Sequence, residues 1–129
     1  MKVLIVDDSP VVRHSIRLLF ETDEDFEVCG EAEDGREAIE KTSELRPELV
    51  IMDLSMPVLN GLDATRTIKR IKPHVPVILF SGFSSALEER EARSVGISAL
   101  VSKSDPSSLL AMAHALRRTN SSSFHDPSP

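Results

Sequence analysis

Apolar residues in this chain gather into five short runs, at 2–6, 26–32, 48–52, 75–80 and 98–101. Each run is short for a buried helix, and the runs at 2–6, 48–52 and 75–80 are rich in the branched residues that strands favour. Within most runs the apolar residues follow one another directly and do not alternate with polar ones. Continuous runs of this kind are typical of strands that are buried on both faces of a parallel sheet.

Helical segments separate these runs, and capping signals mark where several of the helices begin. A serine or aspartate stands at the N-cap, with proline directly after it or glutamate three residues on. These signals are Ser9-Pro10, Asp34 with Glu37, Ser85 with Glu88, and Asp105-Pro106. The side chains expected to face inward include Val12, Ile16, Leu19 and Phe20, then Ala38, Ile39, Thr42 and Leu45, and finally Leu109, Met112, Ala113 and Leu116. The helix at 85–95 has only a thin apolar face, made by Ala86, Leu87, Ala92 and Val95.

Strict alternation of strands and helices predicts an α/β fold with a single doubly wound, five-stranded parallel sheet and five helices on its two faces. We place this domain at residues 1–118. Residues 119–129 are rich in serine and proline, so we predict a flexible tail or a truncated linker there. Ligands of such folds bind at the carboxyl ends of the strands, where the strand order reverses.

Composition narrows the classes of function. The chain has 129 residues, which fits one domain, and 15 basic against 21 acidic residues give a net charge of −6. This balance argues against direct binding of nucleic acid. Cys29 is the single cysteine, so an internal disulfide is excluded and a reducing, cytoplasmic location is favoured. The sequence has no apolar run long enough to cross a membrane, and its N-terminus has no signal-peptide pattern.

Polar residues stand where the predicted strands end: Asp7 and Asp8 after the first, Asp53 after the third, Ser81 after the fourth and Lys103 after the fifth. With strand order 2-1-3-4-5 these ends would be neighbours. Three clustered carboxylates raise one another's pKa values, and oxygen ligands favour a hard cation such as Mg²⁺. An ammonium and a hydroxyl suit a phosphoryl group beside that cation. Asp53 is the candidate nucleophile, because carboxylates form acyl phosphates.

These residues stand in a pattern that resembles the receiver domain of two-component response regulators. The resemblance covers residue 1 to about residue 117 and implies a flavodoxin-like sheet with strand order 2-1-3-4-5. Its motifs are VDD at 6–8, MDLSMP at 52–57, Asn60-Gly61, FSG at 80–82, and Lys103.

The resemblance implies a Mg²⁺-dependent phosphoryl transfer to Asp53 from a histidine kinase or a phosphotransfer protein. Asp8, Asp53 and the backbone carbonyl of Ser55 would hold the Mg²⁺, with Asp7 assisting through water. Lys103 would pair with the phosphoryl group. Slow self-hydrolysis would then end the signal, so the chain would be a phosphoacceptor and not a metabolic enzyme.

The resemblance also implies a switch surface. Ser81 would swing towards the phosphoryl group and draw in the loop after the fourth strand. Partner binding or homodimerisation would then use the face made by the fourth helix, the fifth strand and the fifth helix.

The sequence departs from the family pattern at two positions of this region. Leu100 occupies the switch position, where the family usually has an aromatic residue. Ser104 follows Lys103, where the family often has proline, so a cis peptide bond is not implied there. Phe83, at a position that varies in the family, would shield the phosphoryl site from water.

Several alternatives remain open. The segment KSDPSSLLAMAHAL resembles the corresponding segment of receivers that are attached to helix-turn-helix domains. On this alternative, the chain is the receiver half of a longer DNA-binding transcriptional regulator. A non-phosphorylated interaction module would have lost part of the acidic cluster or the lysine. A dehalogenase-type phosphatase would need an aspartate where Ser55 stands. A dinucleotide-binding protein would need a glycine-rich turn in place of DDSPVV.

Overall fold

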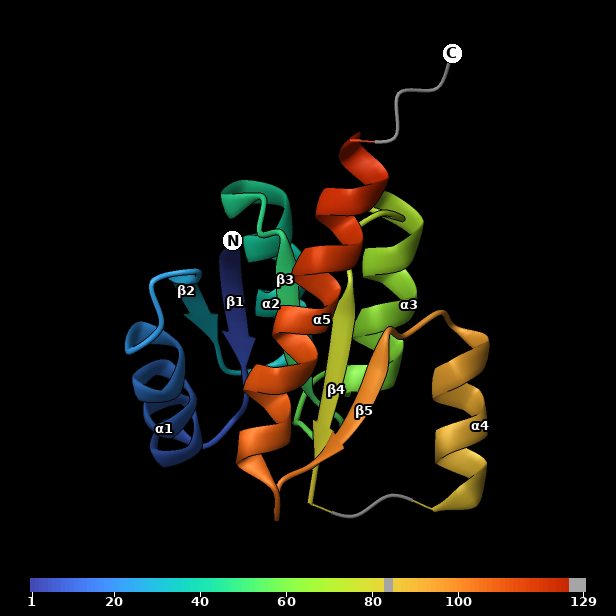
Figure 1. Cartoon of the computed structure of the whole chain (residues 1–129). Coiled ribbons are helices and arrows are strands. Elements are labelled where there is room, and N and C mark those ends of the chain that lie inside the picture. Colours follow the sequence, from blue (N-terminus) through green and yellow to red (C-terminus); the bar gives the residue numbers. More distant parts are fainter. Residues whose placement is uncertain (83–84, 126–129) are drawn as a thin grey trace.

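The computed structural model describes residues 1–82 and 85–125, with side chains described up to Thr119. Strands and helices alternate through the whole described chain (Figure 1). The strands are β1 (Lys2–Val6), β2 (Glu27–Ala32), β3 (Leu49–Asp53), β4 (Val77–Ser81) and β5 (Ala99–Ser102). The helices are α1 (Pro10–Glu21), α2 (Gly35–Leu45), α3 (Gly61–Ile71), α4 (Ala86–Ser94) and α5 (Pro106–His125).

The five strands form one parallel sheet in the order β2-β1-β3-β4-β5. This confirms the predicted doubly wound, flavodoxin-like fold. The order in which strands are added reverses between β1 and β3, because β2 lies on one side of β1 and the later strands lie on the other. The carboxyl ends of β1, β3, β4 and β5 therefore come together in consecutive order.

Two apolar cores cover the two faces of the sheet. Alternate residues of β1 point into different cores: Leu4 packs with α2, α3 and α4, and Ile5 packs with α1 and α5. The three central strands are buried at every residue from Val3 to Val6, from Leu49 to Asp53 and from Val77 to Ser81. The continuous apolar runs in the sequence follow directly, since neither face of these strands meets water.

Helix starts agree with most of the predicted capping signals. The Ser9 hydroxyl accepts from the Val12 N–H at 3.3 Å. Ser85 and Glu88 form the full capping box, in which each side chain accepts from the other residue's N–H. Asp34 accepts from the Glu37 N–H at 2.8 Å, whereas the carboxylate of Glu37 turns to Lys41. The signal at 34–37 is therefore a single cap.

Helix α5 extends from Pro106 to His125, and the domain boundary at Arg118 stays a prediction. Met112, which was expected to face inward, is 36% exposed, because the turn of the helix that packs on the sheet is centred on Leu109 and Ala113. Within the described chain no helix is both long and apolar enough to span a membrane.

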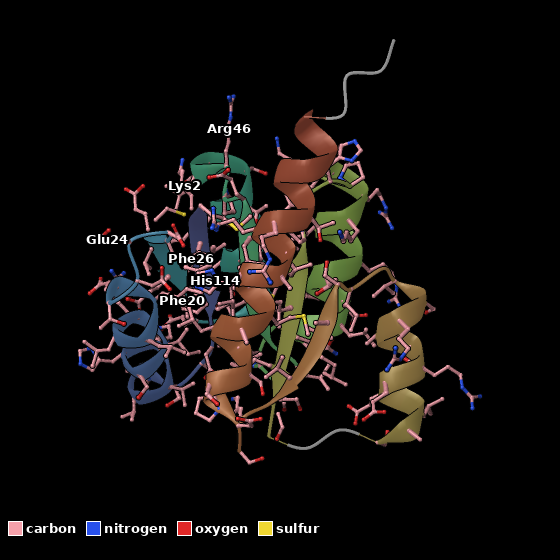
Figure 2. The ribbon with its side chains drawn as sticks, in the orientation of Figure 1. Lys2, Phe20, Glu24, Phe26, Arg46 and His114 are labelled. Atoms are coloured by element: carbon pink, nitrogen blue, oxygen red, sulfur yellow. The ribbon has the colours of Figure 1, made fainter. Side chains whose placement is uncertain are left out.

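Aromatic contacts join α5 to the turn between α1 and β2 (Figure 2). The Phe20 and Phe26 rings meet edge to face at 5.1 Å, and Phe26 meets the His114 ring at 4.8 Å. His114 Nε2 lies 2.7 Å from Asp23 Oδ2. These contacts lie at the amino end of the sheet and leave the carboxyl end free for chemistry.

Helix α4 is weakly anchored. Ala92 is its one buried residue, and Leu87 is 62% exposed. Figure 1 shows α4 at the margin of the molecule, beyond the edge strand β5. The thin apolar face predicted for this helix is confirmed, although only Ala92 of its four members is buried.

Candidate functional site

Four strand ends bring the predicted site residues together. Asp7 follows β1, Asp53 ends β3 and Ser81 ends β4; their residues are 1%, 4% and 6% exposed. Lys103 follows β5 directly, and its backbone N–H donates to the Ser81 carbonyl at 2.8 Å. Asp8 is exposed beside them. Residues from opposite ends of the domain sequence thus share one edge of the sheet.

Lys103 bridges two of the carboxylates. Its Nζ lies 2.8 Å from Asp7 Oδ2 and 3.2 Å from Asp53 Oδ1. Burial lowers the pKa of the ammonium, but its contacts with Asp7 and Asp53 outweigh this effect, and the pKa is raised overall. The lysine therefore stays charged and neutralises part of the acidic cluster.

The carboxyl of Asp53 has a raised pKa at this site. Burial raises the pKa of this carboxyl, the charge of Asp7 raises it further, and the total reaches about 6. Lys103 and the Ser55 N–H, which donates to Asp53 Oδ1 at 3.3 Å, oppose the rise without cancelling it. The site therefore has an excess of negative charge even with its lysine in place.

The acidic cluster has the chemistry of a magnesium site. Asp7, Asp8 and Asp53 each offer a carboxylate oxygen, and these oxygens all lie within 4.8 Å of one another. Three hard oxygen ligands with one lysine for compensation fit a divalent cation, which would relieve the repulsion at Asp53. The Ser55 backbone N–H donates to the Asp53 carboxylate, and this hydrogen bond holds the loop after β3 next to the acidic cluster.

Glycine at position 61 allows helix α3 to start against the site. A Cβ atom there would lie 2.0 Å from the backbone oxygen of Asp53. The Gly61 N–H donates to the Leu54 carbonyl at 2.9 Å, and Asn60 caps the helix by accepting from the Asp63 N–H. The Asn60-Gly61 pair therefore shapes the loop that leaves Asp53.

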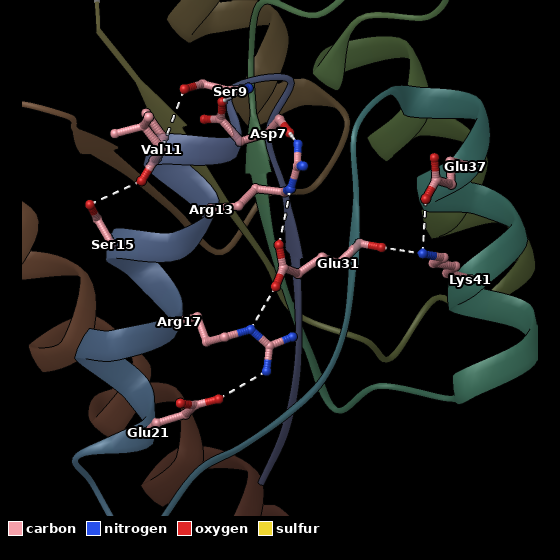
Figure 3. A network of polar contacts seen from close by, with 11 residues as sticks. Asp7, Ser9, Val11, Arg13, Ser15, Arg17, Glu21, Glu31, Glu37 and Lys41 are labelled. Carbon is pink, nitrogen blue, oxygen red and sulfur yellow. Dashed lines mark hydrogen bonds and ion pairs between the residues drawn. The ribbon is translucent and has the colours of Figure 1, made fainter.

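Arg13 is a neighbour of the site that sequence reasoning missed. Its Nη1 donates to the backbone carbonyl of Asp7 at 2.7 Å (Figure 3). A signal was available, since side chains on a helix lean towards its N-terminus and Arg13 stands in the first turn of α1. The sequence did not show that the Asp7 carbonyl would accept a hydrogen bond from an arginine side chain and not from a backbone N–H.

An apolar groove of about 630 Å³, between α1 and α5, was also missed. Lys103 and Phe80 line the end of this groove that meets the site. On α1, Val11 is 75% and Leu18 51% exposed along it. The seven-residue spacing of these two side chains places them on one helix face, but only the fold shows that α5 leaves that face open.

The predicted switch position lies on β5. Leu100 is half-buried and packs on the core beneath α2, α3 and α4. It also lines a pocket of about 240 Å³ with Glu89, Arg93 and Met112, between α4 and α5. The peptide bond between Lys103 and Ser104 is trans, as expected without proline. Phe83 lies outside the described residues.

Comparison with known proteins identifies the family. The family model of the response regulator receiver domain matches residues 3–114. The chain belongs to this family. It is a receiver domain of the two-component response regulators, and so a signalling domain.

Individual relatives agree with this assignment. The chain is 40% identical over 105 residues to a protein-glutamate methylesterase/protein-glutamine glutaminase of Methanococcoides burtonii, a match covering 80% of this chain and 30% of that protein. It is 38% identical over 119 residues to the response regulator protein VraR of Staphylococcus epidermidis, covering 92% and 56%. The isolated receiver domain of RcsB from Salmonella enterica serovar Typhimurium, solved with the phosphomimetic BeF3−, superposes with a TM-score of 0.85 at 30% identity, covering 92% and 88%. The chain thus spans about half or less of the length of these two relatives.

Proposed function

We propose that this receiver accepts a phosphoryl group on Asp53 in a Mg²⁺-dependent reaction and thereby switches a binding surface. The observation that carries the proposal is the meeting of Asp53 with two further carboxylates and Lys103 at the switch point of the sheet. The pKa of Asp53, raised to about 6, supports it as well, because a cation would relieve the repulsion that causes part of this rise.

The chemistry assigned to the chain's own residues is an in-line displacement. An oxygen of Asp53 forms a bond to phosphorus while the N–P bond of a phosphohistidine breaks, and the imidazole nitrogen keeps the bonding pair. The ammonium of Lys103 moves to the transferred phosphoryl oxygens, and the Ser81 hydroxyl donates to one of them. Asp7, Asp8, Asp53 and the Ser55 carbonyl are the residues that would hold Mg²⁺, which supplies charge neutralisation to the phosphoryl oxygens.

Phosphorylation by a small acyl phosphate tests the proposal directly. With Mg²⁺, intact-protein mass spectrometry should show one added phosphoryl group on the wild type and none on Asp53→Asn. Asp63→Asn is a matched control, because it removes a half-exposed carboxylate from the first turn of α3 that does not belong to the acidic cluster. A phosphoryl group that persists on the Asp53→Asn protein would move the nucleophile elsewhere.

The proposed donor is a histidine kinase or a phosphotransfer protein. The apolar groove between α1 and α5 opens beside Lys103, so a helical partner seated there would bring its histidine to Asp53. Val11 and Leu18 would supply the apolar contacts of this docking.

The proposed output surface consists of α4, β5 and α5, and it would serve a partner or a homodimer. Weak anchoring of α4 supports this choice, since a helix that buries one residue is easily displaced. Ser81 stands at the end of β4, on the path to α4, so it would couple phosphorylation to that surface.

A second candidate is the receiver half of a longer transcriptional regulator. The match to the response regulator protein VraR, of which this chain covers 56%, supports a longer protein, and the match to RcsB, a response regulator whose structure concerns DNA interaction, supports a DNA-binding one. DNA binding would then belong to another domain, and the receiver's chemistry would remain as proposed. A cytoplasmic location and the lack of other enzyme activity are part of the same proposal.

A further inference from the structure

The guanidinium of Arg13 connects the end of β1 to the edge strand β2 (Figure 3). Its Nη1 donates to the Asp7 carbonyl at 2.7 Å, and its Nε donates to Glu31 Oε1 at 3.0 Å. The side chain of Arg13 is 15% exposed, and that of Glu31 is 29% exposed. This ion pair is therefore shielded from water more than a typical surface pair, and its geometry is correspondingly well defined.

Arg13 completes the set of contacts that fix Asp7. The Asp7 N–H donates to the Ala32 carbonyl at 3.1 Å, and Asp7 Oδ1 accepts from the Ser9 N–H at 2.9 Å. The Asp7 carbonyl lies beyond the last residue of β1, and the donor that serves it comes from Arg13. Because Asp7 is buried, loss of that donor would leave its carbonyl poorly satisfied and the strand end free to shift.

Glu31 in turn fixes Arg13. Its other oxygen, Oε2, accepts from Arg17 Nε at 2.6 Å, and its backbone carbonyl accepts from the ammonium of Lys41. Arg17 thus shares the same carboxylate as Arg13, while its remaining contact runs outward to Glu21. Only one of the two arginines reaches Asp7, so Arg17 is a natural control for Arg13.

We propose that Arg13 is a positioning residue for the cation site. By holding the Asp7 carbonyl against β2 through Glu31, it sets the spacing between the Asp7 and Asp8 carboxylates and so the affinity for Mg²⁺. Partners that orient metal ligands typically contribute about 10–100-fold to metal affinity. This inference rests on the proposed function, because it concerns the same acidic cluster.

Calorimetric titration of the full chain with Mg²⁺ alone tests the proposal. Arg13→Ala should raise the dissociation constant about 10-fold. Arg13→Lys keeps the charge but lacks the fork that holds both partners, so it should recover only part of the affinity. Glu31→Gln should also weaken binding, since it removes the anion that aims Arg13. Arg17→Ala should stay within about twofold of the wild type, because Arg17 does not contact Asp7.

Thermal unfolding without Mg²⁺ separates positioning from general stability. Arg13→Ala and Arg17→Ala each remove an ion pair with Glu31, so both are expected to lower Tm, whereas only Arg13→Ala should change Mg²⁺ affinity. Equal Mg²⁺ affinities for these two variants would overturn the positioning role. If Arg13→Ala does not fold, unchanged affinity in both Arg13→Lys and Glu31→Gln overturns it. A wild-type chain that binds no Mg²⁺ overturns the proposed function itself, a result visible without any variant.

Discussion

At the scale of single residues, the ionised form of Asp53 is unfavourable in the folded chain. Burial and the neighbouring Asp7 raise its pKa to about 6, well above the value of an aspartate in water. The folded state therefore binds this proton more tightly than the unfolded state does. Stability contributed by the site falls as the pH rises from about 4 through about 6.

We therefore expect Asp53→Asn to stabilise the chain at neutral pH in the presence of a chelator. The gain should be at most about 3 kcal/mol at pH 7, since each pKa unit corresponds to about 1.4 kcal/mol, and should vanish towards pH 4. Chemical denaturation across this pH range measures it. Glu24→Gln, which removes an exposed carboxylate from the α1–β2 turn, is the control and should show no such trend. A gain that does not depend on pH would contradict the electrostatic explanation.

At the scale of elements, α1 contributes to three features of the molecule. Its buried face packs on the sheet through Ile16 and Phe20, its arginines bind Glu31, and its open face lines the groove beside Lys103. The exposed Val11 and Leu18 have no structural need to be apolar. Their position beside the site favours a docking role for this face.

We expect Leu18→Ser to slow phosphoryl transfer from a phosphohistidine partner about 10-fold or more. Phosphorylation by a small acyl phosphate should be unchanged, because Leu18 is about half exposed and lines the groove, whereas the three carboxylates of the acidic cluster do not line it. Transfer assays with radiolabelled donor measure both rates. Leu87→Ser is the matched control, since Leu87 is an exposed leucine of α4 and lies outside the groove. Equal slowing by both substitutions would argue against docking on α1.

At the scale of the whole molecule, the boundary between domain and tail stays a prediction. Leu116 packs on the core beneath α1 and α5, and the Arg117 guanidinium lies 3.3 Å from Asp25. Arg118 and Thr119 are exposed. The last stabilising contacts between α5 and the rest of the domain, among the described side chains, therefore end near position 117.

A chain cut after Arg118 should keep its Tm to within about 2 °C. A chain cut after Ala115 should lose several degrees, because it lacks Leu116 and the Arg117–Asp25 contact. Circular dichroism of the two truncated chains makes the comparison. A large fall in Tm for the longer chain would show that residues beyond 118 pack on the core.

The net charge of −6 also acts at this scale. Because duplex DNA repels an acidic surface, the 129 residues by themselves should not bind it at physiological salt. A gel-shift assay at that salt concentration measures this. The fold by itself does not predict whether these residues bind DNA, because a receiver of this fold can stand alone or be joined to a DNA-binding domain.

The amino-acid sequence by itself determined the class of fold, the strand positions and the identity of the acidic cluster. Each depends on local signals: apolar runs set the strands, caps set the helix starts, and polar residues after the runs mark the strand ends. Parallel strands share one carboxyl edge, and the resemblance to receiver domains supplies the strand order. Together they predict that Asp7, Asp8, Asp53, Ser81 and Lys103 meet.

Only the tertiary structure decided the contacts that tune this cluster. Whether Lys103 bridges Asp7 and Asp53, whether Arg13 reaches the Asp7 carbonyl, and which face of α1 stays open depend on side chains from elements far apart in the sequence. Helical periodicity placed Met112 inward, but the way α5 packs on the sheet left it partly exposed. A local sequence pattern predicts which side of a helix or strand is buried. The packing between elements determines which side chains that buried side contacts.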